Sequence, residues 1–512
     1  MKSLLLLSIC LGLLACEAES DPDAAGARDS ENCPSVGNLT VERSSGLGSG
    51  GRCLISGTLT ETATLSAVSE WHLNGPLIIG DGASSPLLTI EPGVEVFAGK
   101  DGSSADYIYV APGASVNAVG TKASPIILSS DDDNYQGVGE WGGLIIEDTS
   151  ATFGQIRLEY LVVTEAGAEV TVGNKAYADN IVLDGVHDDT FIQYIQSHDS
   201  ARDGIRLTSS GSNPNQARLS WVLITGASRD GLSYNNFSGL VKDMLVIHRP
   251  EFYEGVSGGR AGIYASNTQS LPLFVNVTLV GRDTTSVDSI STDSREFGIV
   301  FADNSNQIRM ANTLISNFRN GCYEIDDTSN LSAMSLGDID ITQGFMDGVH
   351  CGHENSGAVG NVFVPFLVRG SGVNLPASVL NDGIQFHGNT AFNFEGEVNP
   401  STAITSVWYL NSIGAASNDL AANVSGVLNA FSDGDTNNSD AVDNADKDFQ
   451  PLLNSTTAFF GGVNGLSISS QGYDLTTLGA SRSPSSQSAS EFDGWTLQAG
   501  GVFPQEINGF FP

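Results

Sequence analysis

The sequence predicts an all-β protein that folds as one right-handed parallel β-helix, a solenoid of short strands with loops inserted at its corners. Two internal repeats and the composition support this prediction. The 512-residue chain has 59 glycines and only five methionines, which is typical of turn-rich β structure and disfavours a helical bundle. Repeats of fixed length indicate a solenoid in which each repeat is one rung.

The first repeat, the Pro-Gly repeat, consists of two Pro-Gly turns between alternating apolar positions. The segment IEPGVEV at positions 90–96 recurs as VAPGASV at positions 110–116. Proline followed by glycine favours a tight turn, and the alternation around it favours strands. We therefore predict that about one rung separates the two copies.

The second repeat, the Arg-Asp-Gly repeat, keeps the residue type at every matched position over a longer shift. Ile192, Ile195 and the segment 202–205 recur as Leu219, Val222 and the segment 229–232. The apolar segments 274–280 and 308–315 continue the pattern at still longer spacings, so we expect loops inserted at corners on one face. A jelly roll or two-sheet sandwich is the alternative, although it would not repeat the same turn chemistry at rung spacing.

The amino terminus predicts export and a lipid anchor. Lys2 precedes an apolar run, Leu4 to Leu14, that is too short to span a bilayer, so residues 1–15 are predicted to be a signal peptide. The segment Leu13-Leu14-Ala15-Cys16 resembles the lipobox of bacterial lipoproteins. This resemblance implies cleavage before Cys16 and lipidation of its sulfur with acyl chains such as palmitate. An ordinary signal peptide with a chance cysteine is the alternative.

Residues 16–32 are predicted to be a flexible tether, because they are polar and show no apolar period. Glu17 follows the lipobox cysteine. In enteric-type sorting an aspartate there favours the inner membrane, so the resemblance implies lipid anchoring in the outer membrane, at the cell surface or on the periplasmic face. The β-helix is expected over residues 33–399, and residues 400–512 are expected to form final rungs or a C-terminal cap.

The charge balance restricts the partners. With 22 basic and 59 acidic residues, the formal net charge is −37, which repels nucleic-acid phosphates and anionic lipid headgroups. Nucleic acid is therefore not an expected partner, whereas cations and neutral sugars fit equally well. The sequence contains no Gly-Lys phosphate loop, which argues against the nucleotide-binding enzymes that use it.

The cysteines predict two disulfides. Cys10 leaves with the signal peptide and Cys16 carries lipid, so four cysteines remain in an oxidising compartment. Four cysteines allow three connectivities. We predict pairing within two local loops, Cys33 with Cys53 and Cys322 with Cys351.

Several segments resemble a broad group of lipoproteins and secreted proteins of Gram-negative bacteria with a pectate-lyase-like parallel β-helix. They are residues 88–96, 139–146 (GEWGGLII), 183–207, 219–232 and 494–497 (GWTL). The corner motif of that group is usually Asp-Asp-Gly, whereas Arg202 and Arg229 replace the first aspartate here, which puts a family-wide acidic metal site in doubt. Some members occur beside TonB-dependent receptors, so the resemblance implies nutrient capture or adhesion.

The repeated Arg-Asp-Gly corner supplies the candidate catalytic residues Asp203, Asp230, Arg202 and Arg229. Rungs stack about 4.8 Å apart, so the register predicts Asp203 over Asp230 and Arg202 over Arg229. Lyases and hydrolases of this fold use carboxylates and arginines from neighbouring rungs, and carboxyl groups about 5–5.5 Å apart would suit a retaining glycosidase. The alternative is structural: each aspartate bonds its own turn while arginine screens the charge.

Other polar clusters are candidates for acid–base or metal chemistry. His187, Asp188, Asp189, His198 and Asp199 fall within one rung, and His248 follows, so a general acid and base could be assembled there. A disulfide between Cys322 and Cys351 would draw together a second set, predicted to hold zinc or a similar ion: Glu324, Asp326, His350 and His353. Solvated histidines and a disulfide-clamped polar loop are the respective alternatives.

Calcium is the cofactor for which acidic runs offer candidate ligands. The run 433–440 resembles a calcium loop, but Asn438 stands where such a loop needs glycine and Asn444 where it needs glutamate. Asp131, Asp132 and Asp133 form a second acidic run. Solvated acidic loops are the alternative in both places.

Together these features predict a cell-surface binding or scaffold protein that presents a β-helix face to glycan, peptide, nutrient or an outer-membrane receptor. The alternative is a carbohydrate-active enzyme, a polysaccharide lyase or glycoside hydrolase. An enzyme should have a deep groove with convergent carboxylates near Asp203 and Asp230, whereas a scaffold should have a flat face.

Overall fold

A computed structural model gives the architecture of the chain. The structure describes residues 33–44, 52–101, 104–130, 138–149, 153–248, 261–266, 270–281, 296–302, 308–316, 318, 321–325, 339–346, 366–368 and 394–396. These residues form strands β1 to β29 and contain no helix, so none of them lies in a helix able to cross a membrane. The predicted all-β class is confirmed.

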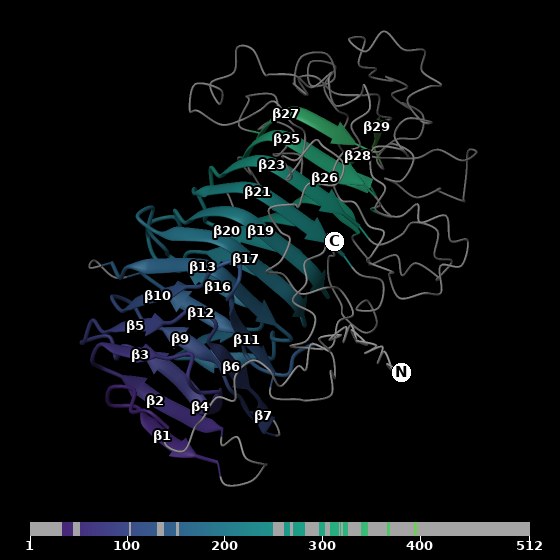
Figure 1. Ribbon diagram of the computed structural model, residues 1–512. Coiled ribbons are helices and arrows are strands. Elements are labelled where there is room, and N and C mark those ends of the chain that lie inside the picture. Colours follow the sequence, from purple (N-terminus) through teal and green to yellow (C-terminus); the bar gives the residue numbers. More distant parts are fainter. Residues whose placement is uncertain are drawn as a thin grey trace, which may run out of the picture.

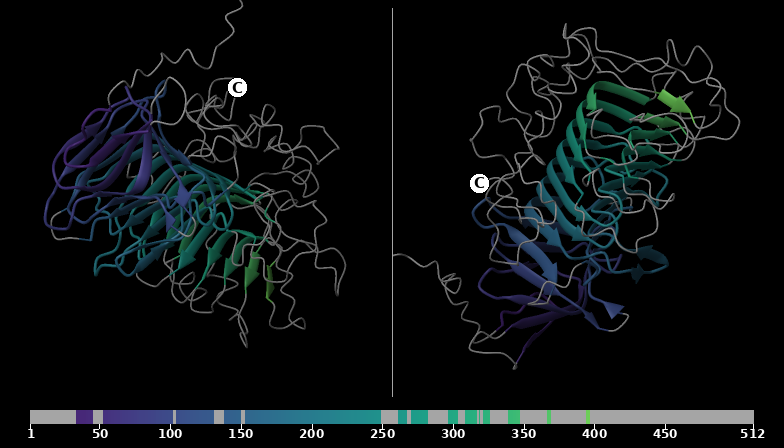
Figure 2. Two further views of the ribbon diagram at one scale, coloured as in Figure 1. Left: turned by 90° about the horizontal axis from the view of Figure 1, so that it is seen from below. Right: turned by 90° about the vertical axis from the view of Figure 1, so that its right-hand side faces the viewer.

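The strands stack in parallel along one axis (Figures 1 and 2), which confirms the predicted right-handed parallel β-helix. Each rung contributes to three faces, which we call A, B and C. Face A contains the second halves of β2 (Cys53–Leu59) and β4 (Trp71–Ile79), followed by β9 (Ile108–Val110), β12 (Leu144–Glu147), β16 (Ile181–Asp184), β18 (Ile205–Thr208), β20 (Leu232–Asn235), β22 (Ile263–Ser266), β24 (Phe297–Phe301), β26 (Gly321–Ile325), β28 (Phe366–Val368) and β29 (Phe394–Gly396).

Faces B and C share the longer strands, which bend between them. Face B contains β3 (Ala63–Leu65), β5 (Leu87–Ile90), β10 (Ser115–Val119) and the first halves of β13 (Ile156–Thr164), β17 (Phe191–Ser200), β19 (Arg218–Ala227), β21 (Leu240–Ile247), β23 (Leu273–Val280), β25 (Ile308–Ser316) and β27 (Ile339–Met346). Face C contains the second halves of these long strands, together with β6 (Glu95–Ala98), β11 (Ile126–Ser130) and the first halves of β2 and β4.

Residues in the left-handed backbone region form the bend between faces B and C. Tyr160, Tyr194, Trp221, Asp243 and Asn276 occupy equivalent positions on successive rungs, with φ between 48° and 56°. Asparagine and aspartate tolerate this region better than other non-glycine residues. Stacking offsets the strain at the aromatic positions, because the rings of Tyr160 and Tyr194 lie 4.4 Å apart and nearly parallel.

The observed register confirms one predicted repeat and corrects the other. Ile192 pairs with Leu219 and Ile205 with Leu232 on the next rung, as the Arg-Asp-Gly repeat predicted. Ile90, however, pairs with Ala118 and not with Val110. The two Pro-Gly turns lie at different corners, one between faces B and C and the other between faces A and B. Pro-Gly suits any tight turn, so the Pro-Gly repeat is not a rung.

Inward-facing side chains of the three faces form one continuous apolar core along the axis. Trp71, Trp141, Phe237, Phe274 and Phe301 are among its largest completely buried members. Alternation along each strand sends every second residue outward. The chemistry of the outer surface therefore depends on the remaining positions.

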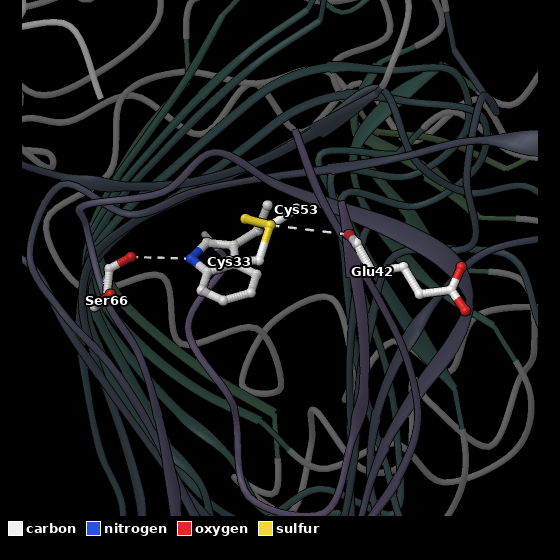
Figure 3. Close-up of a disulfide and its surroundings, with 5 residues drawn as sticks. Cys33, Glu42, Cys53 and Ser66 are labelled. Carbon is white, nitrogen blue, oxygen red and sulfur yellow. Dashed lines mark hydrogen bonds between the residues drawn. A yellow bond between two sulfur atoms is a disulfide. The ribbon is translucent and has the colours of Figure 1, made fainter. Parts of the chain in front are cut away.

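The first rung is covered by β1 (Thr40–Arg43), which pairs antiparallel with β2. The predicted disulfide between Cys33 and Cys53 is present, with its Cα atoms 5.5 Å apart (Figure 3). Beside it the indole nitrogen of Trp71 donates a hydrogen bond to the carbonyl of Ser66 at 2.9 Å. Strand β1 protects the otherwise open N-terminal edge of the solenoid.

Candidate functional site

Three aspartates form a ladder at the corner where face C turns into face A. We define the aspartate ladder as Asp179, Asp203 and Asp230, each two residues before a strand of face A. The side chains of Asp179, Asp203 and Asp230 accept the backbone N–H groups of Asp203, Asp230 and Ala261 at 3.2, 3.2 and 2.8 Å. Each carboxylate therefore binds the corner of the next rung.

The central carboxylate is fully used by the protein itself. Both oxygens of Asp203 accept hydrogen bonds from Arg229, whose Nε and Nη2 lie 2.5 Å away. Ser233 Oγ donates to the same carboxylate at 2.6 Å. With the amide of Asp230, four donors surround a side chain that is 0% exposed. Such a saturated carboxylate is a structural element and has no free lone pair directed at a substrate.

The predicted stacking of the two corners is confirmed, but the arginines differ. The N–H of Arg229 donates to the carbonyl of Arg202 at 3.0 Å, so these residues lie on adjacent rungs. Arg202 is exposed, whereas Arg229 turns toward Asp203. The other cation on the ladder is Arg206 of β18, which lies 3.6 Å from Asp179 and is 39% exposed. The Arg-Asp-Gly repeat did not identify Asp179, because Ala178 and Asn180 replace its arginine and glycine although Ile181 keeps the register with Ile205. Arg206 directly follows the repeat, and Ser233 stands at its position on the next rung.

Burial shifts the pKa values of the two outer aspartates of the ladder, Asp179 and Asp230. Burial, and then the charge of Asp203, raise the pKa of Asp179 to about 6, although Arg206 and Arg229 act in the opposite direction. The same two causes, in the same order, raise the pKa of Asp230 well above its usual range. Desolvation disfavours the charged form of a carboxyl group. Asp179 and Asp230 thus take up protons more readily than exposed aspartates.

A second polar group lies on face A beneath a β-hairpin. Strands β14 (Val170–Val172) and β15 (Lys175–Tyr177) fold over the sheet, and apolar contacts with Tyr109, Ile145 and Val182 hold them there. We define the hairpin cluster as the polar side chains that meet under this hairpin: Tyr109, Glu147, Lys175, Tyr177 and Asp184.

Lys175 is the centre of the hairpin cluster. Its Nζ donates to Glu147 Oε1 at 2.7 Å, Asp184 Oδ2 at 3.2 Å and Ser210 Oγ at 2.6 Å. Glu147 and Asp184 are direct neighbours across β12 and β16, so one ammonium group is shared by two carboxylates and one net negative charge remains.

Two tyrosines complete the cluster. The hydroxyl of Tyr109 donates to Glu147 Oε2 at 3.0 Å. The hydroxyl of Tyr177 is buried and has no hydrogen-bond partner in the part of the chain that the structure describes. Burial and the charge of Glu147 raise the pKa of both phenols, so both remain hydrogen-bond donors. No sequence pattern indicated this cluster, because its residues are far apart in the chain and follow no motif.

The predicted histidine cluster is divided between two corners. His187 follows β16 and lies 2.8 Å from Asp188, with the ring of Phe153 stacked 4.1 Å away. His198 is near the end of β17, where it contacts Thr225 Oγ1 at 2.6 Å and Asp199 at 3.2 Å. A general acid–base pair drawn from both corners is therefore not assembled. Ligand atoms of the half-buried His187 and the exposed Asp188 and Asp189 lie within 4.8 Å of one another, an arrangement that could hold a cation.

The other predicted sites fall largely outside the described residues. Glu324 is buried in β26, the strand that also contains Cys322. The other proposed zinc ligands, Asp326, His350 and His353, lie outside the described residues, as does Cys351. The same holds for the calcium candidates Asp131–Asp133 and residues 433–440, for the lipidation site Cys16 and for the predicted cap, residues 400–512. The second disulfide, the zinc site and the calcium sites stay predictions.

Comparison with known proteins supports the fold. Residues 57–153 match the family described as pectate-lyase like beta helix domain. No curated protein and no solved structure matches the chain significantly. The matched segment ends before the aspartate ladder, so functional inference must rest on the geometry of this molecule.

Proposed function

We propose that this chain is a lipid-anchored binding protein of the bacterial outer membrane that captures glycan on face A. The observation that carries this proposal is the saturation of Asp203. A glycosidase or lyase needs a carboxylate or base that reaches the substrate, and this central carboxylate is buried beneath its own donors.

The exposed part of face A has the chemistry of a saccharide-binding surface. Lys175 and Arg206 retain 30% and 39% of their side-chain exposure, and their ion pairs hold both cations in fixed positions. Donors and acceptors then lie close together on this face. Preorganised polar groups of this kind suit neutral hydroxyl-rich ligands, because little side-chain entropy is lost on binding.

A glycan array combined with mass spectrometry of the products tests binding and turnover together. We expect retention of an intact oligosaccharide that Arg206→Ala weakens about tenfold, the effect of one charged hydrogen bond. The matched control is Lys122→Ala, an exposed lysine in the turn after β10, which should retain full binding. Cleaved products would replace the binding proposal with the enzyme alternative, and no bound glycan on the array would refute glycan capture.

A further inference from the structure

The outer surface of face B has a different composition from face A. The register places one outward residue per rung in a single column: Arg157, Phe191, Arg218, Leu240, Leu273 and Arg309. Asp340 of β27 follows Arg309 on the next rung and ends the basic stretch. The long strands of face B follow one another along the axis in Figure 1. The three arginines are exposed, and Phe191 retains 40% exposure. Rungs about 4.8 Å apart make this column about 24 Å long.

The column is a basic region in a strongly acidic chain. Arg157 and Arg218 form no ion pair with any described residue, and Arg309 has Asp340 as its register neighbour on β27. The adjacent column contains Glu159, which accepts a hydrogen bond from Gln193 at 2.6 Å, and Lys242, which lies 3.1 Å from the buried Asp243. Two exposed acids border the column in the turn before β17, Asp188 and Asp189, both beside His187.

Apolar side chains lie among these cations. Leu271, just before β23, is 40% exposed, and Leu240 and Leu273 are partly exposed. Arginine and aromatic or aliphatic side chains in one plane are typical of a surface at a membrane interface, where guanidinium groups meet phosphates and apolar tips enter the acyl boundary.

The aromatic rings nearby are poorly placed to bind sugars. Arg157 covers Phe191 at 5.0 Å from the ring centroid. Tyr194 lies between Tyr160 and Trp221 in a nearly parallel stack, and Lys242 lies 6.0 Å over Trp221. Because these ring faces are occupied, a pyranose has little aromatic face to stack on. The surface therefore fits a lipid headgroup layer better than a polysaccharide.

We propose that face B docks on anionic lipid headgroups, with the axis of the β-helix along the membrane plane. The net charge of −37 predicts repulsion from such a surface, but charge beyond a Debye length of about 8 Å is screened at physiological salt. The local arginines then dominate the contact, while the acidic remainder is held away from the lipid and fixes the orientation. This docking requires neither glycan binding at face A nor a lipid on Cys16.

Vesicle sedimentation with the mature chain, residues 16–512 carrying Cys16→Ser, tests the proposal without the lipid anchor. We expect binding to vesicles of phosphatidylcholine with phosphatidylglycerol, and not to phosphatidylcholine alone. Each arginine near an anionic surface contributes about fivefold, so the triple variant Arg157→Gln, Arg218→Gln, Arg309→Gln should bind about a hundredfold more weakly. Thermal unfolding should confirm that this variant is folded.

The matched control is Arg202→Gln, which removes an exposed arginine outside face B and should lower binding at most about twofold. Absence of wild-type binding to the anionic vesicles, or equal binding by the triple variant, would overturn the proposal. Immobilised chondroitin sulfate is the third arm. If it were bound through the three arginines while the vesicles were not, face B would be a site for acidic polysaccharide.

Discussion

Each aspartate of the ladder accepts a hydrogen bond from a backbone N–H at the corner of the next rung. Such corner N–H groups lie outside the strands and therefore need an acceptor other than the sheet. An unsatisfied buried donor costs about 1–3 kcal/mol, and a short carboxylate reaches the next rung without a longer side chain. Arg229 then lowers the cost of burying Asp203 by bidentate pairing. The same contacts that stabilise the corner occupy both oxygens of Asp203.

Asp203→Asn should therefore lower stability and leave binding unchanged. The substitution replaces a bidentate acceptor of Arg229 with an amide that supplies one oxygen, and we expect a loss of about 1–3 kcal/mol in the free energy of unfolding. Urea denaturation measures it, and glycan binding by the folded fraction provides the second readout. The control Asp188→Asn, at an exposed aspartate, should stay within about 0.5 kcal/mol. Loss of binding with intact stability would make the ladder part of the ligand site.

Asp179 should make the stability depend on pH. Its pKa of about 6, against 3.8 for an ordinary aspartate, means that the folded state binds the proton more tightly. Stability should therefore fall as pH rises from about 4 to 6. Since one pKa unit corresponds to about 1.4 kcal/mol, wild type should lose up to about 3 kcal/mol relative to Asp179→Asn across that window. Parallel urea titrations at pH 4 and 7 measure the difference, and identical pH profiles for both proteins would contradict it.

At the scale of elements, local patterns were informative where the fold repeats. The Arg-Asp-Gly repeat predicted the pairing of Ile205 with Leu232 correctly, because core alternation and turn chemistry recur together. Turn chemistry alone gave a wrong prediction of the rung length, because the two Pro-Gly turns lie at different corners of the β-helix. The hairpin cluster could not be predicted: β14 and β15 are only three residues each, and their position on face A depends on contacts with distant strands.

The hairpin should depend on Lys175 for its attachment. In Lys175→Met the apolar packing is largely retained, but Glu147 and Asp184 lose their shared cation and repel each other. We expect faster hydrogen exchange in β14 and β15 with unchanged protection of β18 and β20, because the hairpin lies outside the core. Lys122→Met is the control on an exposed lysine. Equal exchange in all three proteins would show that apolar contacts alone hold the hairpin.

For the whole molecule, the faces divide the surface by chemistry. Net charge describes the chain as a uniform anion, yet the arginines of face B are brought into one column only by the stacking of rungs. Their sequence spacings follow loop lengths that no local pattern determines. A β-helix with polar groups on face A and cations on face B has the surfaces for both proposals, glycan binding and contact with a membrane. The contribution of the proposed lipid on Cys16 can then be measured separately from that of face B.

Replacing Cys16 with serine should make the attachment of the protein to the outer membrane sensitive to salt, because the proposed lipid is the strongest attachment. Face B alone would provide weaker binding that salt screens, whereas acyl chains contribute about 0.8 kcal/mol for each buried CH₂ group. Membrane fractionation of wild type and Cys16→Ser, each washed with low and high salt, separates the two contributions. We expect wild type to resist both washes and the variant to be removed by high salt. A variant that stays with the membrane in high salt would show that neither the lipid nor the arginine column is the main anchor.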